Sequence, residues 1–334
     1  MTIKNKQVLL ANRPHGWVQE SDFNIVETDV PAIKDGEVLV KNLYLSLDPY
    51  MRGRMNEGKS YAASMQINDV MVGGTVGVVV ESKNPAFQVD DNVLGYFGWQ
   101  LYGISDGKGL QKINVTDQIP VSAYLGVLGM PGLTAWVGLI SIGQPKAGET
   151  VVVSAASGAV GSVVGQLAKA RGCRVVGIAG GKTKCEYVVK ELGFDSCVDY
   201  KAGHLVEDLT AATPDGIDVY FENVGGEILE AVLDRLNAHA RIPLCGFVSQ
   251  YNATQPHAVR NFGALLINRV KLQGFIVGEH ADLFPQALQE LGQLVASGQL
   301  KYRETIAEGI DDAPRAFIGM LKGENQGKQL VKLA

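Results

Sequence analysis

Residues 146–165, KAGETVVVSAASGAVGSVVG, are the stretch that decides the fold of this chain. The valines at 151–153 form a short β-branched run, which is typical of a strand buried on both faces. A turn of small residues, SAASGAVG, follows at 154–161, and apolar residues then recur at helical spacing over 163–168. The stretch therefore predicts a strand, a tight turn and a helix in direct succession.

The turn has the composition of a dinucleotide-binding loop. Small residues let a pyrophosphate approach the backbone, and the free N–H groups at the start of the helix attract its negative charge. Ala155, Gly158 and Gly161 stand where the three glycines of the usual fingerprint stand. Because glycines also pack helices onto sheets, this pattern by itself leaves cofactor binding open.

The segment that follows favours a particular cofactor. Residues 173–179, CRVVGIA, predict a second parallel strand and complete a β-α-β unit. An acid about 20 residues beyond the fingerprint would bind the ribose 2′-hydroxyl of NAD. Here residues 180–184, GGKTK, contain two lysines and no acid. Lysine attracts a 2′-phosphate that a carboxylate would repel, so we expect NADPH. The alternative is a solvated helix start with two ordinary surface lysines.

Composition and charge restrict the classes of protein to consider. A chain of 334 residues, 46% apolar and 19% charged, suits a globular protein of two domains. The formal net charge of −5 argues against nucleic acid or an anionic membrane as a partner. We expect no signal peptide and no membrane span. The four cysteines include no C-x-x-C pair, which predicts free thiols and a cytoplasmic location.

The pattern along the chain predicts two different domains. From Asn5 to about Val121 strand signals dominate, with 38–47 and 70–80 the clearest, and indicate a small barrel or partly open sheet. Helical spacing begins near Pro120, and strands then alternate with helices as in a doubly wound parallel sheet. The expected strands there are 151–153, 173–179, 217–222, 241–246 and 270–277, and the expected helices are 182–192, 227–236 and 283–296.

The end of the chain returns to a strand, a helix at 313–321 and a strand at 328–333. We expect this tail to complete the first domain. The prediction is thus an α/β chain with one domain at 1–124, completed by 299–334, and a second at 125–298.

Six stretches, in order over nearly the full chain, resemble the zinc-free branch of the medium-chain dehydrogenase/reductase superfamily. They are LSLDPYMRGRM (45–55), VLGMPGLTAW (127–136), AASGAVGSVVGQLAK (155–169), YFENVGG (220–226), CGFVSQYN (245–252) and LKGENQGK (321–328). Within that branch the chain is most similar to the NADPH-dependent alkenal/one reductases, which include the leukotriene B4 12-hydroxydehydrogenase/prostaglandin reductases and the bacterial curcumin reductases. The resemblance implies a GroES-like β-barrel catalytic domain, a Rossmann domain that binds NADPH, and a homodimer.

The resemblance also implies roles for individual residues. Lys184 and Tyr200 would hold the adenosine 2′-phosphate, and Asn223 and Asn325 would contact the ribose and phosphate parts of the cofactor. The full set of implied cofactor contacts is Ala155, Gly158, Val160, Gly161, Lys184, Tyr200, Asn223, Cys245, Ser249, Tyr251, Phe275, Val277 and Asn325.

A zinc site is not expected. The zinc-dependent branch uses cysteine, histidine and glutamate ligands in its catalytic domain. Residues 1–121 have no cysteine and only His15, and Val72-Gly73-Gly74-Thr75 stands where zinc enzymes carry Gly-His-Glu. Three ligands cannot be gathered from these residues.

Without a metal to polarise a carbonyl, reduction of a conjugated C=C bond is easier to arrange than ketone–alcohol interconversion. A hydride would go to the β-carbon of a small enone or enal, and the carbonyl oxygen would need hydrogen-bond donors as it becomes an enolate. Tyr251 matches a family tyrosine near the nicotinamide, and a phenol donates without being charged. Tyr61 is the second candidate donor, with an exposed loop aromatic as its alternative. Tyr50, Tyr61 and Tyr251 are the expected substrate contacts.

Two other interpretations stay open. One is a zinc-free quinone oxidoreductase of the same superfamily, although the tyrosine-bearing elements at 48–52 and 249–252 argue against it. The other is a non-catalytic NADPH-binding protein. Oxidation of NADPH with an enone, with a quinone, or with neither separates the three.

Overall fold

The computed structural model describes residues 2–334, and the chain divides into two compact units. Unit 1 consists of the residues up to Gly126 together with Glu304–Ala334, and unit 2 is Val127–Arg303. The domain boundaries predicted from the sequence lie between residues 124 and 125 and between residues 298 and 299. No helix among residues 2–334 has both the length and the apolar character needed to cross a bilayer.

Unit 2 contains a six-stranded parallel sheet in the order β10-β9-β8-β11-β12-β13. Its strands are β8 (Thr150–Ser154), β9 (Arg174–Ala179), β10 (Ser196–Asp199), β11 (Ile217–Phe221), β12 (Leu236–Leu244) and β13 (Lys271–Gly274). The strand order reverses between β8 and β11, and ligands of such sheets bind at the carboxyl ends of the strands beside this switch point. The predicted doubly wound sheet is confirmed.

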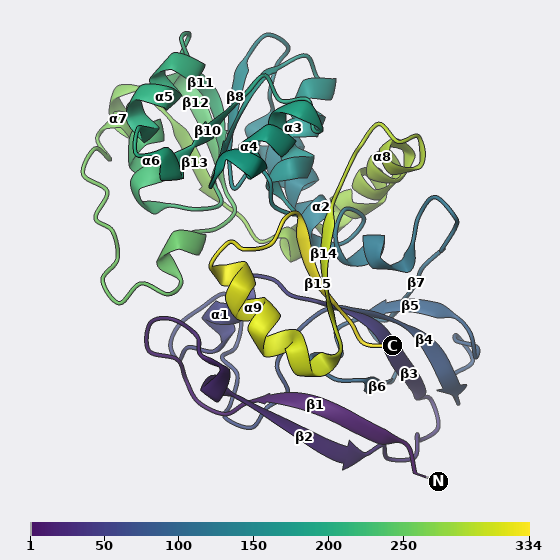
Figure 1. Ribbon diagram of the computed structural model, residues 1–334. Helices are drawn as coiled ribbons and strands as arrows, with labels where there is room; N and C mark the ends of the chain where they lie inside the picture. Colours follow the sequence, from purple (N-terminus) through teal and green to yellow (C-terminus); the bar gives the residue numbers. More distant parts are fainter. Residues whose placement is uncertain (1) are drawn as a thin grey trace. The chain divides into compact units, whose positions relative to one another are not determined.

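The helices of unit 2 are α2 (Met130–Trp136), α3 (Gly161–Ala170), α4 (Lys182–Lys190), α5 (Leu205–Ala212), α6 (Gly226–Leu233), α7 (Ala264–Ile267) and α8 (Phe284–Ala296). Figure 1 shows α3 and α4 on one side of the strands and α6 and α7 on the other. The valines of β8 are fully buried, as predicted. Because side chains alternate along a strand, Val152 packs with Leu209 of α5 and Val232 of α6, and Val151 and Val153 face the side that α3 covers.

The elements predicted for unit 2 do not include β10, whose four residues are Ser-Cys-Val-Asp, or the helices α5 and α7. The fourth strand was expected at 241–246, but β12 begins at Leu236, where the preceding helix was expected to end. Residues 236–240, LNAHA, have little strand propensity, and β12 forms there because Leu236 pairs with Ile217 of β11.

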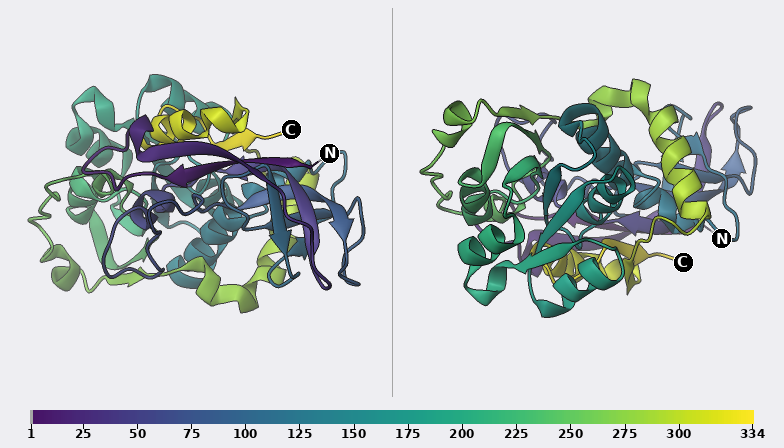
Figure 2. Two further views of the ribbon diagram at one scale, coloured as in Figure 1. Left: turned by 90° about the horizontal axis from the view of Figure 1, so that it is seen from below. Right: turned by 90° about the horizontal axis from the view of Figure 1, so that it is seen from above.

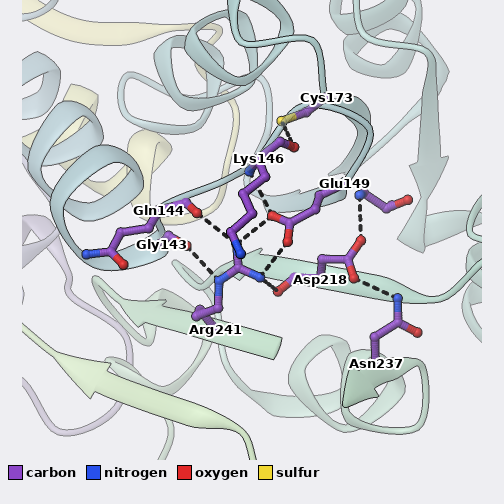
Figure 3. Close-up of polar contacts among 9 residues, drawn as sticks. Gly143, Gln144, Lys146, Glu149, Cys173, Asp218, Asn237 and Arg241 are labelled. Carbon is purple, nitrogen blue, oxygen red and sulfur yellow. Dashed lines mark hydrogen bonds and ion pairs between the residues drawn. The ribbon is translucent and has the colours of Figure 1, made fainter. Parts of the chain in front are cut away.

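A polar cluster around Arg241 of β12 lies near the amino ends of β8 and β11 (Figure 3). The Arg241 guanidinium donates to both oxygens of Glu149, at 3.0 and 2.5 Å, and to the carbonyls of Gly143 and Gln144, each at 2.9 Å. Asp218 accepts from the Thr150 N–H at 2.8 Å in the same cluster. Burial opposes ionisation of Glu149, but its hydrogen bonds with Arg241 hold the pKa of that carboxyl below its usual value.

Unit 1 is built on a seven-stranded sheet and a two-stranded ribbon. The ribbon is β1 (Lys4–Leu10) with β2 (Phe23–Asp29), and the sheet contains β3 (Val38–Ser46), β4 (Thr75–Ser82), β5 (Asn92–Gly95), β6 (Tyr102–Ser105), β7 (Gln111–Lys112), β14 (Glu304–Glu308) and β15 (Lys328–Lys332). The strand expected at 70–80 begins only at Thr75 and ends at Ser82, so the glycines at 73 and 74 lie before it.

The C-terminal segment belongs to this sheet, since β15 pairs antiparallel with β3. Helix α9 (Ala313–Leu321) lies beside the ribbon of β1 and β2, as Figure 2 shows in its left view. Its Phe317 packs edge-on against Trp99, with 5.5 Å between ring centroids. The buried Lys328 donates to the Leu47 carbonyl at 2.6 Å and pairs with Asp48 at 3.3 Å.

Candidate functional site

The turn between β8 and α3 is closed so tightly that it requires small residues. Ala155 takes a positive φ of 51°, and its carbonyl accepts the Gly158 N–H at 2.9 Å. A Cβ on Gly161 would lie 2.4 Å from the Ala155 oxygen, so no larger residue fits there. Val160 directly precedes α3. This turn and the start of a ten-residue helix fit a pyrophosphate, because they offer backbone N–H groups without side chains in the way.

A second part of the site lies at the carboxyl ends of β9 and β10. A Cβ on Gly180 would come within 2.8 Å of the Tyr200 ring and 3.0 Å of Cε of Lys201, so both side chains pack over this glycine. Lys184 is half-buried on α4, and burial followed by the charge of Lys201 lowers its pKa. An anion such as a 2′-phosphate would offset the repulsion between the two ammonium groups, so the lysines fit such a ligand.

A carboxylate that the sequence analysis did not consider also lies here. Asp199 ends β10, and its Oδ1 accepts the N–H groups of Gly181 at 2.7 Å and Lys201 at 3.0 Å. No acid follows the second predicted strand directly in the sequence, as expected. In the folded chain, however, Asp199 at the end of the next strand lies beside the same loop. Because its oxygen is engaged by backbone donors, we interpret Asp199 as a residue that shapes this loop.

The third part of the site is at the switch point itself. Asn223 follows the end of β11, and its side-chain Nδ2 donates to the Ser154 carbonyl at 2.8 Å. Its backbone N–H donates to the Ser154 hydroxyl oxygen at 2.9 Å. One amide hydrogen of Asn223 is thus directed at β8, and the carboxamide oxygen is an acceptor that Asn223 can present to a ligand.

Tyr251 lies at the same edge of the sheet, after the short 3-10 turn Val248–Gln250. Its hydroxyl oxygen accepts the Phe247 N–H at 3.3 Å. A Cβ on Gly246 would lie 2.9 Å from that oxygen and 3.6 Å from the Asn223 carbonyl, so Tyr251 and Asn223 are neighbours. A phenol oxygen that accepts one hydrogen bond can donate its own proton to another acceptor.

Four further residues of unit 2 are expected cofactor contacts, and the structure places some of them in turns and others in the core. Ser249 fixes the 3-10 turn, because its hydroxyl donates to the Val224 carbonyl at 2.6 Å. Burial, and then the charge of Glu222, raises the pKa of Cys245 to about 12. The Phe275 ring packs in the core against Phe221, with 6.4 Å between centroids, which leaves its backbone as the part available to a ligand. Val277 begins a further 3-10 turn, Val277–Leu283.

Tyr50, Tyr61 and Asn325 belong to unit 1. Tyr50 begins α1 (Tyr50–Arg54), and burial, followed by the charge of Asp48, raises its pKa. The phenols of Tyr96 and Tyr61 are near enough to add to this effect, so unit 1 gathers three tyrosines. Tyr61 is 62% exposed. Asn325 donates through Nδ2 to the Gly327 carbonyl at 2.9 Å.

Sequence reasoning missed several members of these groups: Ser154, Asp199, Lys201, Glu222 and Tyr96. A polar residue at the end of an apolar strand was the available signal for Ser154 and Glu222. Lys201 stands next to the predicted Tyr200. Tyr96 gave no signal, because it comes close to Tyr50 only through the fold.

Within residues 2–334, no three His, Cys, Asp or Glu side chains are grouped so that they could hold a metal ion. Metal independence stays a prediction that needs a measurement.

Sequence comparisons identify the family. Residues 6–113 match the family described as N-terminal domain of oxidoreductase, and residues 159–293 match the family described as zinc-binding dehydrogenase. The NADPH-dependent curcumin reductase of Escherichia coli (strain K12) is 50% identical over 337 residues, which are 99% of this chain and 97% of that protein. The chain belongs to the zinc-free medium-chain dehydrogenase/reductase family.

Other members of the family agree with this assignment. A 2-alkenal reductase (NADP(+)-dependent) of Nicotiana tabacum is 44% identical over 342 residues, 99% of this chain and 98% of that protein. The crystal structure of CurA in complex with NADPH from Vibrio vulnificus is similar, with a TM-score of 0.95, 49% identity and coverage of 98% of this chain and 99% of that one. The predicted family and its two-domain α/β fold, with a GroES-like and a Rossmann domain, are confirmed.

Proposed function

We propose that this protein uses NADPH to reduce the C=C bond of α,β-unsaturated ketones and aldehydes, including enones of the curcumin type. The observation that carries the proposal is the 50% identity, over 99% of this chain, with an enzyme named as an NADPH-dependent curcumin reductase. The alkenal reductase at 44% identity extends the substrate class from enones to enals.

The three groups at the carboxyl edge of the sheet have distinct roles in this proposal. The turn 155–161 binds the pyrophosphate, and Lys184, Tyr200 and Lys201 bind the 2′-phosphate. Asn223 accepts a hydrogen bond from a ribose hydroxyl. NADPH, when bound, supplies the hydride that adds to the β-carbon of the substrate. The chain itself contributes binding, orientation and hydrogen-bond donors.

Tyr251 is the proposed donor to the carbonyl oxygen of the substrate. Negative charge develops on that oxygen as the β-carbon gains hydride. A fixed hydrogen-bond donor therefore stabilises the transition state more than it stabilises the bound substrate. The Phe247 N–H, at 3.3 Å from the phenol oxygen, helps to hold that oxygen in place. We propose Tyr61 as a second donor or a pocket residue, and Tyr50 as a residue that binds substrate.

The proposal includes a homodimer and a cytoplasmic location. β13 is the outer strand of the sheet in unit 2, and Leu266 and Ile267, shortly before it, are 83% and 72% exposed. An outer strand beside exposed apolar side chains fits a second copy of the chain. The four cysteines are free, which fits a reducing compartment.

A spectrophotometric assay tests the function. NADPH oxidation is followed with a conjugated enone, with a matched saturated ketone, with a quinone and with no acceptor, and the products are identified by mass. We expect turnover of the enone to the saturated ketone, with none on the saturated ketone. Turnover of the quinone alone would identify a quinone oxidoreductase. If none of the acceptors were reduced, the protein would be a non-catalytic one.

A further inference from the structure

Glu222 is a fully buried acid at the switch point of the parallel sheet, where β11 ends. Its Oε1 accepts hydrogen bonds from four groups: the Ser154 hydroxyl at 3.1 Å, the Tyr220 hydroxyl at 3.0 Å, the Val224 N–H at 2.6 Å and the Gly225 N–H at 3.0 Å. Its backbone carbonyl accepts from Cys245 at 2.9 Å and Gly246 at 3.2 Å. One residue thus connects the carboxyl ends of β8, β11 and β12.

The hydrogen bonds of Glu222 enclose Asn223 from both sides. On one side, the Ser154 hydroxyl bonds to Glu222 and also accepts the Asn223 N–H at 2.9 Å. On the other side, the two N–H groups after Asn223 both point at the Glu222 carboxyl. Gly225 has a positive φ of 74°, so the turn cannot be an ordinary continuation of the strand.

Burying an acid at this position has a free-energy cost. Burial raises the pKa of Glu222, which its four hydrogen bonds oppose, and no basic partner contributes. Its Oε2 is buried and has no hydrogen-bond partner among residues 2–334. An apolar side chain of similar size would avoid this free-energy cost, but it would leave the Tyr220 hydroxyl and the N–H groups of Val224 and Gly225 without this acceptor. The side-chain oxygen of Glu222 is thus a single acceptor shared by the donors around Asn223.

We propose that Glu222 is a positioning residue for the cofactor, which fixes Asn223 through Ser154 and the Val224–Gly225 backbone so that the Asn223 carboxamide oxygen faces a ribose hydroxyl. The inference rests on the proposed contact between Asn223 and NADPH. Glu222 is fully buried and acts only through its neighbours.

The test compares cofactor dissociation constants of single and double variants. In Glu222→Leu and Ser154→Ala, we expect Kd for NADPH and for NADH each to rise roughly tenfold, because a ribose contact is common to both cofactors. Glu222→Gln keeps an acceptor oxygen and is expected to stay within about threefold of the native Kd. Asn223→Ala is expected to weaken both cofactors to a similar extent. Added to Asn223→Ala, neither Glu222→Leu nor Ser154→Ala should weaken binding further.

Asp218→Asn is the matched control, because Asp218 is a half-buried acid at the opposite end of the same strand. It is expected to lower the melting temperature and leave both Kd values unchanged. Native Kd values in Glu222→Leu, or additive losses in the double variants, would overturn the proposal. If Glu222→Leu does not fold, Ser154→Ala with and without Asn223→Ala decides the question by the same criterion.

The proposed function and the role of Glu222 can be contradicted separately. A native protein that binds NADPH but does not reduce an enone would contradict the proposed function and leave the role of Glu222 standing. Unchanged Kd values in Asn223→Ala would overturn the contact and, with it, the role of Glu222.

Discussion

Lys184 is the residue on which cofactor choice is expected to depend. Its ammonium lies near that of Lys201, and a 2′-phosphate would be bound by both charges. Losing one charge-assisted contact costs about 1.5–3 kcal/mol, so Lys184→Ala should weaken NADPH about 10- to 100-fold and hardly affect NADH. Titration of both cofactors measures this. Lys182→Ala, an exposed lysine on the same helix, is the control, and equal weakening of NADPH and NADH would contradict the assignment.

Tyr251 is the residue on which the chemical step is expected to depend. Tyr251→Phe removes a donor to the developing enolate and should lower kcat about 10²- to 10³-fold, with NADPH affinity little changed. Tyr61→Phe should act mainly on KM if Tyr61 only lines the pocket. Single-turnover hydride transfer to an enone at saturating NADPH measures the step. An unchanged rate in Tyr251→Phe would limit Tyr251 to packing and leave Tyr61 as the candidate donor.

Among the elements, those with a strong local pattern could be predicted from the sequence and those made by pairing could not. The valines of β8 and the small-residue turn carry their own signal. β10 has only four residues, and Leu236 joins a strand because Ile217 lies beside it. The residues of the candidate site also divide into those with a local sequence pattern and those brought together by the fold. Ala155, Gly158 and Gly161 follow from the small-residue turn and Lys184 from the lysines after the second predicted strand, whereas the hydrogen bonds of Glu222 depend on residues up to 68 positions away.

The Arg241 cluster joins elements far from the switch point, so its loss should affect stability and not cofactor binding (Figure 3). Arg241→Met removes the hydrogen bonds to Glu149 and should lower the free energy of unfolding by about 2–4 kcal/mol. Urea unfolding of the native protein and of Arg241→Met measures it, with the exposed Lys182→Ala, outside the cluster, as the control. Because the folded-state pKa of Glu149 is lowered, its contribution is fully present above the unfolded pKa and is lost as pH falls through the folded-state pKa. The difference between native and Arg241→Met should therefore shrink in acid, and a change in NADPH affinity would contradict a purely structural role.

For the whole molecule, we expect activity without a metal ion. The proposed mechanism stabilises the enolate with hydrogen bonds, so no step needs a Lewis acid. Prolonged incubation with a chelator, followed by gel filtration, should leave enone reduction unchanged, and elemental analysis should find zinc well below one equivalent. A full equivalent of zinc that is lost together with activity would reveal a site that sequence and structure both missed.

The oligomeric state is the last prediction for the whole molecule. Within residues 2–334, β13 pairs with β12 alone, and the exposed side chains of Leu266 and Ile267 lie a few residues before it. Pairing with a second copy would satisfy the free edge and bury this apolar surface. The double variant Leu266→Glu with Ile267→Lys should therefore shift the protein from dimer to monomer by light scattering, with NADPH affinity retained. Val206→Glu, at a 58% exposed apolar position on α5, is the matched control and should stay dimeric. A native protein that is monomeric at micromolar concentration would contradict the dimer, and a double variant that remains dimeric would place the interface on another surface.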